Sequence, residues 1–119
     1  MTSFTGQLTI LPVHASPVFA ALADPTRREV VQRLGRRPMR AGQLAAAVGL
    51  SAPAMSRHLR ILLRAGVITD ERSRDDARVR VFRLRPQGLA ELQRWLDALQ
   101  ADWDAQLASF SRQATRSRR

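Results

Sequence analysis

Several residue types are missing from this chain of 119 residues, and each absence narrows the classes of function. The chain has no cysteine, which excludes a disulfide framework and thiol redox sensing. It has no tyrosine, and aromatic residues make up only 5% of the sequence. Exposed aromatics that could stack on RNA bases are therefore lacking, and RNA binding ranks behind the hypotheses developed below.

Long hydrophobic runs are also missing. No apolar run approaches the length of a bilayer-spanning helix, and residues 1–15 lack a basic region followed by a long apolar stretch. We therefore expect no membrane partner, no secretory signal and a cytoplasmic location. The length and the 45% hydrophobic content predict one globular domain.

Motifs that carry catalysis or bind metals are not found either. The sequence has no glycine-rich phosphate loop and no nucleophile elbow. Its only histidines are His14 and His58, whereas zinc and copper sites need several nitrogen or sulfur ligands that converge. At its position on the predicted helix, His58 borders the apolar face and is expected to form structural hydrogen bonds. We expect no enzyme activity, no cofactor and no metal.

What the chain does have is positive charge. All 20 basic residues are arginine, and the formal net charge is +10. Residues 27–85 contain 15 arginines and five acidic residues, whereas residues 86–111 carry a net charge of −3. The basic residues are spread over several short elements, unlike those of a membrane-binding amphipathic helix. This distribution favours nucleic acid as the partner.

The hydrophobic periodicity predicts a mainly α fold with a small β-hairpin. Capping residues followed by proline, at Ser16-Pro17 and Asp24-Pro25, predict two helix starts. The predicted helices begin near residue 16 and span about 24–34, 41–48, 51–64 and 86–110, and the predicted strands span 67–74 and 78–84. We expect an N-terminal arm (1–15), a DNA-binding domain (16–111) whose last helix (86–111) mediates dimerisation, and a basic tail (112–119).

The spacing within residues 41–60 is typical of a helix-turn-helix. The motif needs a small residue where its helices cross, a glycine in the turn and a buried apolar residue in the second helix. Ala45, Gly49 and Met55 occupy these positions. Other inward positions are occupied by Leu44, Val48, Leu50, Leu59 and Leu62.

The face of the second helix opposite Met55 and Leu59 is basic, which suits the major groove of DNA. Arg57 can reach both acceptors of a guanine edge, and Ser51 with the first backbone N–H groups can bind phosphate. A solvated arginine face, or a protein-interaction module of the same shape, is the alternative, but such a module would present an apolar face. The predicted DNA-binding residues of this motif are Ser51, Ala52, Pro53, Ala54, Ser56, Arg57, Arg60 and Arg64, with Arg40 and Gln43.

The predicted hairpin offers a second basic surface, formed by Arg72, Arg74, Arg78 and Arg80. Such a wing could reach a neighbouring minor groove. Asp75 and Asp76 at the tip weaken this interpretation, because carboxylates repel phosphate. The alternative is an edge hairpin that its charges keep soluble.

The last predicted helix carries apolar residues at spacings of three and four, which is typical of a coiled-coil seam. A seam this long favours a two-fold homodimer that presents two recognition helices to a palindrome. The alternative is that the stripe folds back on its own domain, and part of it is expected to do both. The predicted dimer residues are Leu89, Leu92, Leu96, Leu99, Trp103, Leu107 and Phe110.

Three stretches together resemble the ArsR/SmtB family of winged-helix repressors: FAALADPTRREVVQRL, AGQLAAAVGLSAPAMSRHLRILLRAGVI and VRVFRLRP with the following WLDALQADW. The resemblance covers about residues 17–110 and implies a dimer, a repressor role and a recognition helix at 51–64. It does not extend to metal sensing, since the positions of the family's metal ligands hold AGQLAAAV and acidic residues without histidine. The chain is more similar to the branch without a metal site, which leaves an effector ligand or a partner protein open as the signal.

Overall fold

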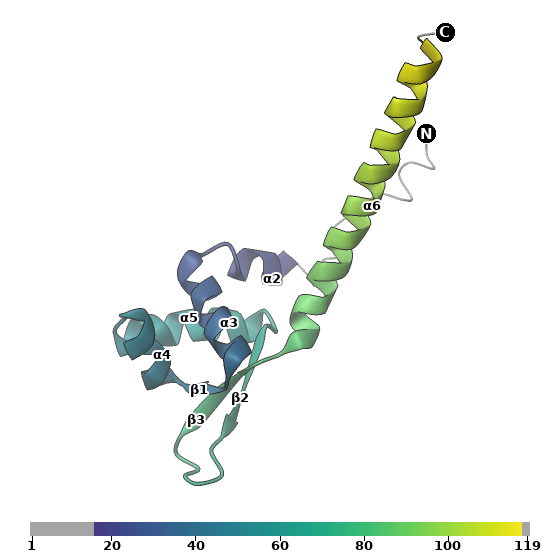
Figure 1. Cartoon of the computed structure of the whole chain (residues 1–119). Helices are drawn as coiled ribbons and strands as arrows, with labels where there is room; N and C mark the ends of the chain where they lie inside the picture. Colours follow the sequence, from purple (N-terminus) through teal and green to yellow (C-terminus); the bar gives the residue numbers. More distant parts are fainter. Residues whose placement is uncertain (1–15, 118–119) are drawn as a thin grey trace.

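A computed structural model describes residues 16–117, which form a small body and one long projecting helix (Figure 1). The predicted N-terminal arm lies outside these residues. The helices and strands follow one another in the order α2 (Ser16–Ala21), α3 (Pro25–Arg36), β1 (Met39–Arg40), α4 (Ala41–Val48), α5 (Ala52–Arg64), β2 (Ile68–Arg72), β3 (Arg80–Leu84) and α6 (Pro86–Ser117). This is a mainly helical winged helix-turn-helix, as the sequence predicts.

The strands form one antiparallel sheet in the order β1-β3-β2. The sequence pattern did not predict β1, because two residues are too few to show an alternation. Met39 lies opposite Phe82, and Ile68 lies opposite Leu84. Both hairpin strands are shorter than predicted, since the residues nearest the tip form a turn.

Side-chain caps fix where two of the helices begin. Asp24 Oδ1 accepts hydrogen bonds from the backbone N–H groups of Thr26 (2.7 Å) and Arg27 (3.1 Å) before α3 starts at Pro25. These bonds lower the pKa of the Asp24 carboxyl below its usual value, and the bond from Arg27 has the larger effect. The predicted cap and proline-led start of α3 and the predicted Ser51 cap of α5 are thus confirmed. At Ser16-Pro17 a helix does begin, but Ser16 is its first residue and not a residue that precedes it.

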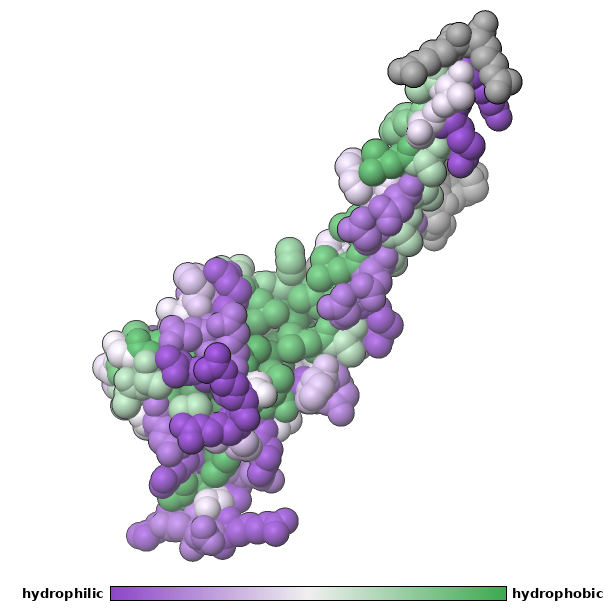
Figure 2. Space-filling view, in the orientation of Figure 1, coloured by the Kyte–Doolittle hydropathy of each residue, from purple (hydrophilic) through white to green (hydrophobic). Residues whose placement is uncertain are grey.

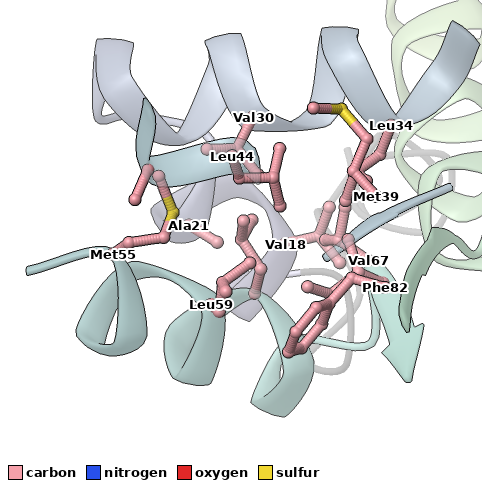
Figure 3. Packing of buried hydrophobic residues seen from close by; sticks show 13 residues of the cluster. Val18, Ala21, Val30, Leu34, Met39, Leu44, Met55, Leu59, Val67 and Phe82 are labelled. Carbon is pink, nitrogen blue, oxygen red and sulfur yellow. The ribbon is translucent and has the colours of Figure 1, made fainter. Parts of the chain in front are cut away.

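The core lies where α3, α4 and α5 meet the sheet (Figure 3). Met55, Leu59 and Leu62 of α5 are buried in one cluster with Leu44 of α4 and Val30 of α3. No buried polar side-chain atom of the described residues lacks a hydrogen-bond partner. α5 is therefore held on one side by an apolar core, which fixes the direction of its other side.

Helix α6 has 32 residues and is about 48 Å long. Leu89 and Leu92 pack against the core, and the rings of Phe19 and Trp95 meet edge to face at 6.1 Å between centroids. The rest of α6 projects away from the body (Figure 1). It continues past the predicted end near 110 to Ser117, because no glycine or proline interrupts the polar C-terminal turns.

Across residues 16–117, none of the helices is both long and apolar enough to cross a membrane.

Candidate nucleic-acid interface

The turn between α4 and α5 has the geometry that the motif requires. Gly49 has φ 81°, in the left-handed region that glycine adopts without strain. The backbone N–H groups of Gly49 and Leu50 both donate to the Ala45 carbonyl at 2.9 Å. Ala45 itself is buried at the crossing of the two helices. The chain therefore reverses tightly and directs the start of α5 outward.

Ser51 caps α5 and presents that start. Its Oγ accepts a hydrogen bond from the backbone N–H of Ala54 at 3.3 Å. The hydroxyl hydrogen remains a donor, since a serine hydroxyl donates one hydrogen bond while it accepts others. Ser51, Ala52 and Pro53 are exposed, and Ala54 is half-buried. A phosphate can reach this end of the helix without any rearrangement.

The predicted basic face of α5 is free. Met55 is fully buried, whereas Ser56, Arg57, Arg60 and Arg64 are exposed. Among the residues that the structure describes, these three arginines form no ion pair or hydrogen bond to another side chain. We call Ser56, Arg57, Arg60 and Arg64 the arginine ridge. It is the outer side of a helix whose inner side is locked in the core.

The structure brings the ridge next to the base of the wing. Ser56 and Arg60 of α5 line a hollow of about 200 Å³ together with Arg80 of β3 and Ala41 of α4. Ala41 is the first residue of α4, so the start of that helix borders the hollow. Arg40 does not line it, because its partner in β3 is Val81, whose side chain lies on the other face of the sheet from Arg80 and Phe82. One surface therefore joins the ridge, the start of α4 and the wing.

Gln43 has a structural role in addition to the predicted one. Its Oε1 accepts the backbone N–H of Arg40 at 2.9 Å, which caps the first turn of α4. Both side chains are exposed. The Gln43 amide NH₂ and the Arg40 guanidinium thus remain available as donors to a ligand.

The wing differs from the ridge, because two of its four predicted arginines already contact carboxylates. The Arg78 Nε and Nη2 atoms donate to the two Asp76 carboxylate oxygens at 3.1 and 3.2 Å. These bonds hold the pKa of the Asp76 carboxyl below its usual value. Arg80 pairs with Asp70 across the strands, with Nε to Oδ2 at 2.6 Å, and lies over the Phe82 ring.

The other two predicted wing arginines are free. Arg72 and Arg74 are exposed and form no ion pair within residues 16–117. They end β2 and begin the tip, on the edge of the molecule away from α6 (Figure 1). Of the two acidic residues that weaken the wing hypothesis, Asp76 is paired with Arg78. The Asp75 carboxylate is exposed at the tip.

Sequence reasoning missed the role of Arg27. Its side chain is only 14% exposed, its Nε donates to the Ala21 carbonyl at 2.6 Å, and its Nη1 lies 3.4 Å from His58 Nδ1. Because a guanidinium has donors only, the His58 nitrogen is the acceptor of this contact. Arg27 thus ties the α2–α3 turn to α5, and His58 has the structural role predicted for it. The only sequence signal for this role was the position of Arg27, three residues after the helix cap Asp24 in ADPTRR.

Hydrophobic surface is concentrated on α6 and where it leaves the body (Figure 2). Of the predicted dimer residues, Leu89 and Leu92 are half-buried against the core, whereas those further along are exposed. Trp103 is 58% exposed and Phe110 is 64% exposed. The exposed members are Leu96, Leu99, Trp103, Leu107 and Phe110. An apolar stripe of this extent on a projecting helix is typical of an interface.

No group of three or more histidine, cysteine, aspartate or glutamate side chains that could hold a metal occurs in the described part of the chain. His14 lies outside that part.

Comparisons with known proteins agree with this geometry. Residues 22–71 match a family described as helix-turn-helix domain. The chain is 39% identical over 103 residues to the HTH-type transcriptional regulator Rv2034 of Mycobacterium tuberculosis, covering 85% of this chain and 91% of that protein. Over a shorter stretch of 55 residues, 46% of this chain and 61% of the other, it is 46% identical to the transcriptional repressor SdpR of Bacillus subtilis.

Solved structures agree as well. A crystal structure of an ArsR family transcriptional regulator superposes with a TM-score of 0.69 at 31% identity. The match covers 76% of this chain and 97% of that one.

Proposed function

The chain belongs to the ArsR family of winged helix-turn-helix transcriptional regulators, and from this premise we propose that it is a homodimeric repressor of a palindromic operator. As a family member it is a DNA-binding regulator and not an enzyme. The observation that carries the proposal is the arginine ridge of α5, whose arginines are exposed and, within the described part of the chain, have no side-chain partner.

In the proposed complex α5 is the recognition helix and lies in the major groove. Arg57 donates two guanidinium hydrogen bonds to the O6 and N7 acceptors of one guanine. The Ser51 hydroxyl and the Ala52 backbone N–H bind a phosphate, because Pro53 has no N–H and Ala54 already donates to Ser51. Arg60 binds another phosphate where the ridge meets the wing. Arg72 and Arg74 contact the flanking backbone or minor groove. This division makes Arg57 the residue of specificity and the others residues of affinity.

The dimer is supported by the apolar stripe on α6. Burial of Leu96, Leu99 and Trp103 against the same residues of a second copy removes a large apolar area from water. A two-fold axis through this stripe relates the two recognition helices, so that each meets one half of a palindrome. The body keeps its own core, and the dimer is made by the part of α6 that the body does not cover.

Repression is supported by the likeness to the repressor SdpR, which extends over 55 residues at 46% identity. A regulator that occupies a promoter can repress it by excluding other proteins from the same DNA. The proposal therefore places repression in DNA occupancy alone.

Selection of binding sites from random duplexes with the purified protein tests the proposal. We expect an enriched palindrome with a guanine at the same position of each half-site, and reduced transcription in vitro from a promoter that contains it. Enrichment of single, unpaired half-sites would contradict the dimer. Absence of any enriched sequence would contradict sequence-specific recognition.

A further inference from the structure

Two glycines meet where the recognition helix ends and α6 begins. Gly66 follows the C-terminal end of α5, with φ 76°, and Gly88 is the third residue of α6 and is buried. A Cβ atom on Gly88 would overlap the Gly66 carbonyl oxygen and lie 2.9 Å from the carbonyl carbon. Backbone here packs directly on backbone, with no room for any side chain at residue 88.

Hydrogen bonds hold the two segments in this contact. The Arg85 backbone N–H donates to the Val67 carbonyl at 2.7 Å, and the Arg85 Nη1 donates to the Gly66 carbonyl at 3.2 Å. Within the second segment, the Gly88 N–H donates to the Arg85 carbonyl at 3.0 Å and fixes the first turn of α6. We call the contact of Gly66 and Gly88, with Arg85 beside it, the glycine joint.

The glycine at 88 has a cost that the contact explains. Glycine forms helices less readily than alanine. It stands here in the first turn of α6, where it permits the close approach to Gly66. The chain thus gives up helix stability at the place where α6 touches the turn after α5.

We propose that the glycine joint determines specificity for operator spacing. It sets the angle between α5 and α6, and this angle sets the distance between half-sites that the dimer accepts. The inference rests on the proposed dimer. The recognition helix lies on one side of the joint, and on the other side α6 extends to the stripe around Trp103, about 22 Å further along the helix. Among the glycines of the described residues, none other comes as close to another stretch of backbone as Gly88 does.

A small change at the joint is enlarged at the DNA. With a methyl group at 88, the two backbones must move apart by about 1 Å before the contact reaches the 3.0 Å below which real Cβ contacts are essentially never seen. Because α6 is a continuous helix, this shift rotates the body relative to the dimer axis. The two-fold axis moves the second recognition helix in the opposite sense, so the error in spacing is doubled.

The test compares Gly88→Ala with the adjacent exposed control Gln87→Ala on a palindrome and on a single half-site. Gly88→Ala should bind the half-site within about 2-fold of wild type. It should lose about 10-fold or more on the palindrome, because simultaneous engagement of two sites depends on geometry. Selection with operators lengthened or shortened by one base pair should show a changed preferred spacing. Sedimentation must show that the variant is still a dimer.

Arg85→Ala keeps the proposal testable if Gly88→Ala does not fold. It removes only the side-chain bond to Gly66 and should widen the range of accepted spacings. Unchanged spacing and palindrome affinity in the folded variant would overturn the inference. A wild-type protein that binds palindrome and half-site equally would instead contradict the proposed dimeric function.

Discussion

The recognition helix and the wing are both rich in arginine, but their arginines have different partners. On α5, Arg57, Arg60 and Arg64 have no acidic partner among the described residues. On the hairpin, Arg78 and Arg80 are bound by Asp76 and Asp70. From sequence and charge alone, the arginines of α5 and those of the hairpin appear equally available to DNA. Their contacts show that α5 can offer its full charge to DNA, whereas the wing offers about half.

The largest expected effect is the loss of the dimer, which leaves one recognition helix on the DNA instead of two. Leu96→Asp with Leu99→Asp should give a folded monomer, since both side chains are exposed outside the core. Affinity for the palindrome should fall by about 10²-fold or more, because the second site is no longer tethered. Sedimentation and a binding titration measure this.

The matched control for this variant is Ala98→Asp with Ala101→Asp. It adds the same charge to the opposite, exposed side of α6. The control should remain a dimer and bind as wild type does. A dimeric Leu96/Leu99 variant would place the interface elsewhere on the chain.

Next in size is the loss of base recognition by α5. Arg57→Ala should cost about 1–3 kcal/mol on the operator and much less on random DNA, because a bidentate contact to guanine discriminates between bases. Arg94→Ala, an exposed arginine on α6, is the control for loss of charge alone. Equal losses of affinity on operator and random DNA would show that Arg57 does not recognise a base.

The wing should contribute through phosphates. Replacement of both Arg72 and Arg74 by alanine should weaken binding to all sequences alike. It should also reduce the slope of log K against log salt concentration by about 0.9 for each phosphate that is no longer neutralised. Arg78→Ala should change the slope less, because Asp76 already neutralises that arginine. Equal changes of slope for Arg72, Arg74 and Arg78, each replaced singly, would contradict the difference between paired and free arginines.

The smallest expected effect has the opposite sign. Asp76→Asn should strengthen DNA binding a few-fold, because it frees Arg78 while the amide oxygen can still accept the Arg78 backbone N–H that the carboxylate accepts at 3.0 Å. Asp75→Asn makes the same change of charge at the preceding position and frees no arginine. Titrations at several salt concentrations should show a steeper slope for Asp76→Asn alone, and equal slopes for both variants would contradict this account of the wing.

Much of this arrangement could be predicted from the sequence, because local signals determine it. The cap at Ser51, the turn glycine at position 49 and the stripe of Met55, Leu59 and Leu62 each act within one or two helical turns. Together they fix which side of α5 is buried. The free side then follows from helical geometry.

The features that could not be predicted depend on contacts between distant segments. The pairing of Arg80 with Asp70 follows from the strand register. Strand β1 forms by pairing Met39 with Phe82 and Arg40 with Val81, more than 40 residues away in the sequence. The contact of Gly88 with Gly66 requires the placement of α6 on the body. None of these leaves a periodic pattern in the sequence.

The central claim, that the outer side of α5 enters the major groove, is tested most directly by removing one acceptor from the DNA. Each operator guanine is replaced in turn by 7-deazaguanine, which lacks N7, and wild type is compared with Arg57→Ala in a double-mutant cycle. We predict one position in each half-site where the replacement weakens wild-type binding and leaves the variant unaffected. Losses that are the same for both proteins at every guanine would contradict the account.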